Sequence, residues 1–250
     1  MLLQAAILPA RADMPVDVEL VIAADVSISM DREEALLQQQ GFVEAFRHPD
    51  ILRAIDSGPA GRIAVTYLEW GGDRRHRVVV PWVLIDGAES AGRFADRLET
   101  SRPARFKRGT SISSALVRSH DLLQHSGFAG ARRVINISSD GVNNKGPKLA
   151  HVRARLLADG VTINGLPIVY KGLLDGVVAE PAVRADPAFL IDYFERDVIG
   201  GPYAFVEPVT AIESYADAIR RKLVREIAAP MYAGADSAAT PATDNVFVRR

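Results

Sequence analysis

The sequence predicts an α/β protein with a single doubly wound, mostly parallel sheet, helices on both faces and one antiparallel edge strand. The apolar run at residues 20–24 is uninterrupted, as in a central parallel strand that is covered on both faces. Strand and helix patterns alternate along the chain without internal repeats. Residues 63–70 and 77–85 read as two strands joined by a glycine-rich hairpin connection, and Pro81 favours an edge position for the second.

Apolar periodicity predicts the helices of the first half. A helix is expected over residues 31–48, where His48 and the proline after it end the pattern. Its expected core positions are Leu36, Phe42, Val43 and Phe46. Residues 88–100 form the next predicted helix. A third helix is predicted after Thr110, with apolar positions spaced i, i+3, i+4, i+7 and i+11. These positions are Ile112, Ala115, Leu116, Ser119 and Leu123, of which Ser119 is the one polar exception.

The second half continues the alternation of strands and helices. Strands are predicted over residues 134–137, 161–169 and 203–207, and a helix over 147–159 is closed by Gly160. Asp186 and Pro187 form a cap and first-turn pair that opens another helix, which ends before the glycine pair 200–201. The last helix has one apolar face, made of Ile212, Tyr215, Ala216, Ile219, Leu223 and Ile227.

A polar cluster stands where the first apolar run stops. Asp25, Ser27 and Ser29 form an Asp-x-Ser-x-Ser motif directly after residues 20–24. Ligands of open parallel sheets gather at the carboxyl ends of the strands, so this motif lies where a site is expected. Carboxylate and hydroxyl oxygens are hard donors, and they indicate a divalent-cation site.

Two later segments each add one oxygen donor in a loop. Thr110 lies just before the N-terminus of a predicted helix. Asp140 follows the strand over residues 134–137, and Gly141 allows the backbone to turn sharply away. The predicted metal ligands are therefore Asp25, Ser27, Ser29, Thr110 and Asp140.

This donor set suits Mg²⁺, with Mn²⁺ or Ca²⁺ as alternatives. Mg²⁺ prefers about six oxygens at about 2.1 Å, keeps several waters and commonly uses only one or two carboxylates. With Asp25 and Asp140 as the only acidic ligands, the shell would stay incomplete and attract an outside carboxylate. The loops around it, including Ile28, Met30, Arg108 and Asn143, would form the rim. The competing interpretation is that these residues only cap helices and end strands, as their types often do.

The three segments, in this order along the chain, resemble the metal-ion-dependent adhesion site of von Willebrand factor A (VWA) domains. Residues 139–144, 198–206 and 218–223 are more narrowly similar to a bacterial branch of A-like domains of unknown function. The resemblance covers residues 15–228, and Ile28 departs from the glycine that many A domains carry there. It implies a Mg²⁺-dependent, non-enzymatic module that binds a protein partner through an Asp or Glu carboxylate of that partner.

Composition agrees with one α/β domain and excludes several classes. The chain has 250 residues, 48% of them hydrophobic, and a formal net charge of −1, which gives no bulk electrostatic reason to bind nucleic acid. No apolar run reaches the length of a membrane span, and the absence of cysteine excludes disulfides and thiol catalysis. Nucleophile-elbow, dinucleotide and phosphate-loop motifs are missing. A metal-dependent hydrolase and a metal-free structural module remain as alternatives.

The two ends of the chain carry separate expectations. Residues 1–12 are mostly apolar and end in Ala-Arg-Ala, which has the small-x-small form of an export cleavage site and predicts a shortened signal peptide. This favours a periplasmic or secreted protein, with the cytoplasm as the alternative. Residues 229–250 are rich in Ala, Thr, Pro and Ser and are expected to form a flexible tail.

Overall fold

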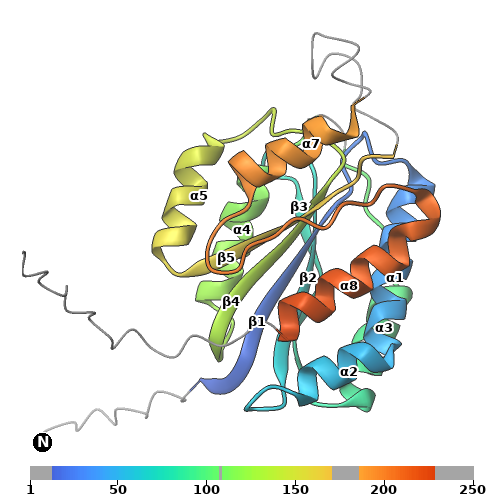
Figure 1. Ribbon diagram of the computed structural model, residues 1–250, viewed down its shortest axis with the longest axis vertical. Coiled ribbons are helices and arrows are strands. Elements are labelled where there is room, and N and C mark those ends of the chain that lie inside the picture. The colour runs from blue at the N-terminus through green and yellow to red at the C-terminus, as the bar shows by residue number, and fades with distance from the viewer. Residues whose placement is uncertain (1–12, 107–108, 171–185, 229–250) are drawn as a thin grey trace, which may run out of the picture.

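The computed structural model describes residues 13–106, 109–170 and 186–228 (Figure 1). The expected signal peptide and tail lie outside them. Five strands form one sheet in the order β3-β2-β1-β4-β5. They are β1 (Met14–Asp25), β2 (Ile63–Trp70), β3 (His76–Ile85), β4 (Phe128–Ser139) and β5 (Val161–Pro167). Only β3, at the edge, runs antiparallel to its neighbour. The predicted fold class is confirmed.

Helices cover both faces of the sheet (Figure 1). One face carries α1 (Arg32–Arg47), α2 (Pro49–Asp56), α3 (Ala88–Glu99) and α8 (Tyr215–Ala228). The other carries α4 (Ile112–Gln124), α5 (Leu149–Ala158) and α7 (Pro187–Tyr193), which runs on into the π-helical turn η1 (Phe194–Val198). A 3₁₀ turn, η2 (Ile212–Ser214), precedes α8. None of the described helices is long and apolar enough to cross a membrane.

The central strand β1 supplies the core on both faces. Val18, Leu20 and Ile22 pack under the α1 and α8 face, whereas Val21 and Ala23 pack under the α4 face. These side chains alternate because successive residues of a strand point to opposite faces. Burial on both faces explains the uninterrupted apolar run in the sequence.

The start of α1 is set by a reciprocal cap. The side chain of Asp31 accepts from the backbone N–H of Glu34 at 2.9 Å, and the Glu34 carboxylate accepts from the N–H of Asp31 at 2.9 Å. The predicted core position of Leu36 is wrong, because this side chain is 44% exposed. The buried face of α1 passes through Ala35 and Phe42 instead, and Leu36 lies outside that stripe.

Three other expectations need correction. His48 and Pro49 do not simply end a helix, because they cap and open the short helix α2. Residues 203–207 do not form a strand, and this stretch makes only isolated bridges, such as Gly165 with Val206. Pro208 has no N–H to extend such pairing. The last helix begins at Tyr215, three residues later than its apolar pattern suggests.

Candidate metal centre

The fold brings the predicted oxygen ligands to one edge of the sheet. Asp25 is the last residue of β1, and Asp140 directly follows the neighbouring strand β4. The two parallel strands end together because their register pairs Ala23 with Ile137. A Cβ atom built at Gly141 would lie 3.9 Å from the hydroxyl oxygen of Thr110, so this threonine lies beside the turn that follows Asp140.

Short polar contacts link four of the five residues. The Oδ1 of Asp25 accepts from the backbone N–H of Ser27 at 2.7 Å. The hydroxyl oxygens of Ser27 and Ser29 are 3.0 Å apart, and Ser29 donates to Oδ1 of Asp140 at 2.6 Å. Asp25, Ser27 and Asp140 are buried, whereas Ser29 is partly exposed. The cluster is therefore continuous from the strand end to the surface.

Backbone contacts hold the Thr110 loop against the loop after β4. The N–H of Thr110 donates to the side-chain oxygen of Asn144 at 2.9 Å, and its carbonyl accepts from the N–H of Asn144 at 3.0 Å. The side chain of Asn143 accepts from the N–H of Ser113 in the first turn of α4. Thr110 is only 6% exposed. Two asparagines thus position Thr110, a candidate ligand that no regular element holds.

The donor arrangement fits a small octahedral cation. Neighbouring oxygens of an octahedron with metal–oxygen distances of about 2.1 Å lie about 3.0 Å apart. The hydroxyl oxygens of Ser27 and Ser29, which share a hydrogen bond, are 3.0 Å apart and so already have a separation that such a shell can use, whereas Ser29 donates to Asp140 at a shorter 2.6 Å. Within the described residues no three His, Cys, Asp or Glu side chains form a metal-binding group. In a cation site built here, hydroxyls would supply much of the shell, and such oxygen donors suit Mg²⁺ better than a softer ion.

Burial changes the acid–base chemistry of Asp25. Loss of hydration, followed by the nearby charge of Asp140, raises the pKa of Asp25 from 3.8 to about 7, although hydrogen bonds from Ser139 and Ser27 act in the opposite direction. Without a cation, this carboxyl group is partly protonated at neutral pH. A bound divalent ion would favour the ionised form.

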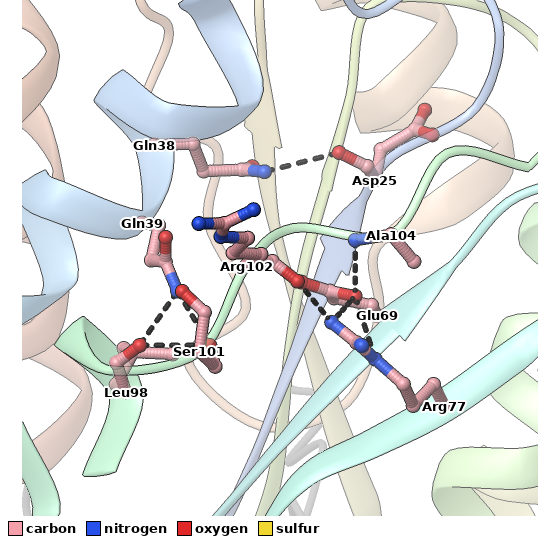
Figure 2. Close-up of polar contacts among 9 residues, drawn as sticks. All are labelled: Asp25, Gln38, Gln39, Glu69, Arg77, Leu98, Ser101, Arg102 and Ala104. Atoms are coloured by element: carbon pink, nitrogen blue, oxygen red, sulfur yellow. Dashed lines mark hydrogen bonds and ion pairs between the residues drawn. The ribbon is translucent and has the colours of Figure 1, made fainter. Parts of the chain in front are cut away.

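Three supporting residues are missing from the sequence-based site. Ser139 donates to Oδ2 of Asp25 at 2.6 Å. Gln38 of α1 donates to the Asp25 carbonyl at 3.0 Å (Figure 2), and Ser138 donates to the side-chain oxygen of Gln38 at 2.5 Å. Alternation along β4 could have indicated Ser139, because residue 137 pairs beside Ala23 and the same face continues to Asp25. No local pattern indicates Gln38, which reaches the site only through tertiary packing.

The structure places the four expected rim residues in different environments. Ile28 is 52% exposed beside the cluster, but Met30 is 2% exposed and belongs to the core under α1. Asn143 is half-buried and holds α4. Arg108 lies outside the described residues. Of these four, Ile28 is the one that the structure places at the surface.

Sequence comparison identifies the family. A family model described as "Protein of unknown function (DUF1194)" matches residues 15–231. The chain belongs to this family. A search of curated proteins returned no match. The DUF1194 match covers all the elements that carry the candidate site.

Solved structures share the VWA fold at low sequence identity. A von Willebrand factor type A protein from Catenulispora acidiphila is 16% identical with a TM-score of 0.54, over 85% of this chain and 43% of that one. The pilus adhesin SpaC from Lactobacillus rhamnosus GG is 13% identical with a TM-score of 0.59, over 86% of this chain and 30% of that one. Proximal thread matrix protein 1 from the mussel byssus, with a zinc-occupied MIDAS motif, is 15% identical with a TM-score of 0.52, over 85% of this chain and 47% of that one. This DUF1194 chain has a VWA-like fold and spans less than half of each of these proteins.

Proposed function

We propose that this DUF1194 domain is a Mg²⁺-dependent, non-enzymatic protein-binding module. The observation that carries the proposal is the cluster of hydroxyl and carboxylate oxygens at the adjacent ends of β1 and β4, where Ser27, Ser29 and Asp140 already lie within hydrogen-bond distance, each of the next. Asp25, Ser27, Ser29, Thr110 and Asp140 would hold the ion directly or through water. An adhesin and a byssus matrix protein among the proteins of similar fold support a role in binding rather than catalysis.

The proposed partner presents an Asp or Glu carboxylate to the ion. The bound Mg²⁺ would supply positive charge at the surface, where Ser29 is partly exposed. Two protein carboxylates leave the cation incompletely neutralised, so an acidic side chain of a partner would complete the shell. Asp25 and Asp140 orient the site, and Ser139 and Gln38 keep Asp25 in place.

Thermal unfolding tests whether the proposed ligands bind a divalent cation. A ligand that binds only the folded state raises the melting temperature by mass action. We expect Mg²⁺ or Mn²⁺ to raise it for the wild type and for the control Asp192→Ala, an exposed carboxylate on α7. Asp25→Ala and Asp140→Ala should remove the rise while the protein stays folded. A rise that persists in both variants would refute the assignment of the ligands.

Partner capture tests the function. Protein from the native host should bind the wild type in Mg²⁺, and EDTA or Thr110→Ala should release it, because both weaken the metal site. The Asp192→Ala control should bind normally. Capture that is equal in EDTA and with Thr110→Ala would mean that the domain binds through another face.

We also propose that the protein works outside the cytoplasm. The Ala-Arg-Ala sequence at residues 10–12 and the adhesin of similar fold support this location. Terminal sequencing of the mature protein from its host should find Asp13 as the first residue. A cytoplasmic form that retains Met1 would exclude export at this position.

A further inference from the structure

We infer that a cleft lined by Arg32, Arg102 and Arg105 is a second recognition site, which receives a glutamate of the partner next to the carboxylate on the metal. The inference rests on the proposed function. The cleft has a volume of about 290 Å³. It opens between the start of α1 and residues 102–105, which lead from α3 toward the Thr110 loop.

The cleft lies directly beside the candidate metal centre. Met30, which lines it, is the next residue after the ligand Ser29. The N–H of Phe106 donates to the carbonyl of Val26 at 3.2 Å, so the segment carrying two of the arginines runs along the Asp25 loop. One peptide segment could therefore reach both places.

Charge favours an acidic occupant. Arg32, Arg102 and Arg105 are exposed, and in the part of the chain that the structure describes no carboxylate forms an ion pair with them. Arg77, by contrast, is paired with Glu69. One carboxylate, Asp31, also lines the cleft, and it accepts from the N–H of Glu34. The residues that line the cleft therefore include three guanidinium groups and one carboxylate. Their net positive charge would attract an acidic group of a partner.

The walls favour glutamate among acidic groups. Apolar residues also line the cleft: the nearly buried Met30 and Ala35, and the more exposed Leu36 and Pro103. Small-molecule pockets start at about 300 Å³, so the cleft suits one or two side chains better than a cofactor. A glutamate would place its methylene groups on this apolar wall and its carboxylate between guanidinium groups. Leu36, which the packing of α1 leaves 44% exposed, would be covered by such a side chain.

Hydrogen bonds from α1, β2 and β3 hold the segment that carries Arg102 (Figure 2). The carbonyl of Arg102 accepts from Arg77 at 2.6 Å, and the N–H of Ala104 donates to the buried carboxylate of Glu69 at 2.9 Å. Gln39 of α1 donates to both the carbonyl and the hydroxyl of Ser101. The Arg102 side chain extends toward the helix of Gln38 and Gln39, away from Arg77. A preorganised wall loses little conformational freedom on binding.

Selection from randomised displayed peptides in Mg²⁺ tests the inference. Peptides selected on the wild type should carry two acidic residues a few positions apart, with glutamate preferred at one of them. For such a peptide, Arg102→Ala combined with Arg105→Ala should weaken binding about tenfold, as for loss of a charge-assisted contact. The control Arg97→Ala removes an exposed arginine that does not line the cleft and should have no effect.

A double-mutant cycle with the peptide assigns the contact. Replacing its glutamate by glutamine should weaken binding to the wild type and change nothing for the double arginine variant. If EDTA abolishes binding but the arginine substitutions do not weaken it, the inference is wrong and the proposed function stands. If the arginines matter while EDTA and Asp25→Ala have no effect, the metal-dependent function is wrong. Equal competition by inorganic phosphate would identify a phosphoryl site and overturn the glutamate assignment.

Discussion

At the scale of single residues, Asp25 is the position where stability and function oppose each other. Its carboxyl group is completely buried, and Asp140 adds a second negative charge nearby. Ser27 and Ser139 compensate only part of this cost through hydrogen bonds. A group that is unfavourable without a ligand and favourable with a cation is typical of a binding site rather than of a core.

The stability of the metal-free protein should depend on this carboxyl group. Because burial and Asp140 raise the pKa of Asp25 from 3.8 to about 7, the folded state holds a proton that the unfolded state releases. The associated stability is present below about pH 4 and is lost as the pH rises to about 7. Melting temperatures in EDTA should therefore fall over this range for the wild type, and Asp25→Asn should flatten the fall.

Magnesium should reverse this trend. The ion competes with the proton on Asp25, so the increase in melting temperature that it causes should be larger at pH 8 than at pH 5. Asp192→Asn, at an exposed position, provides the control and should behave as the wild type does. An Mg²⁺ effect of equal size at both pH values would contradict proton competition at Asp25.

At the scale of elements, the segment after α3 depends on side chains from elsewhere. It has no regular hydrogen bonding of its own over residues 102–106. Gln39 donates to the Leu98 carbonyl at 2.6 Å and to Ser101, while Glu69 accepts from Ala104. The position of this segment therefore follows from α1 and β2.

Removing Gln39 should destabilise this junction. Gln39→Ala removes the buried donor to the Leu98 carbonyl, which keeps its hydrogen bonds from Ser101, so we expect a loss of about 0.5–1.5 kcal/mol in the free energy of unfolding. Gln40→Ala, at the exposed neighbouring position of α1, should change it by less than about 0.5 kcal/mol. Urea denaturation measures both values. Equal effects would mean that the Gln39 contacts contribute little.

At the scale of the whole molecule, a buried polar cluster joins the C-terminal helix to the sheet. Lys222 and Glu226 of α8 form an ion pair in which both side chains are fully buried. The Glu226 carboxylate also accepts from Asn136 of β4 at 2.9 Å and from Asn164 of β5 at 3.1 Å. These contacts fix how α8 packs across two strands.

Breaking this pair should weaken the entire domain. Lys222→Met leaves the Glu226 carboxylate buried without its cation, and we expect a loss of about 3–5 kcal/mol in the free energy of unfolding. Arg93→Ala removes the exposed i,i+4 pair with Glu89 and should cost about 0.3–0.5 kcal/mol. Denaturant unfolding compares the two. A similar small loss for both variants would show that the buried pair is not needed.

The sequence by itself determined the fold class, the edge strand and the places of the proposed ligands. These follow from local features, because strand ends, Pro81 and polar residues after apolar runs are visible without the fold. Only the tertiary structure brought Gln38 to both Asp25 and Ser138, which is 100 residues away, and formed the cleft between Arg32 and Arg102. It also left Leu36 exposed, because the packing of α1 against α8 and α3, rather than residue type, decides which stripe of this helix is buried.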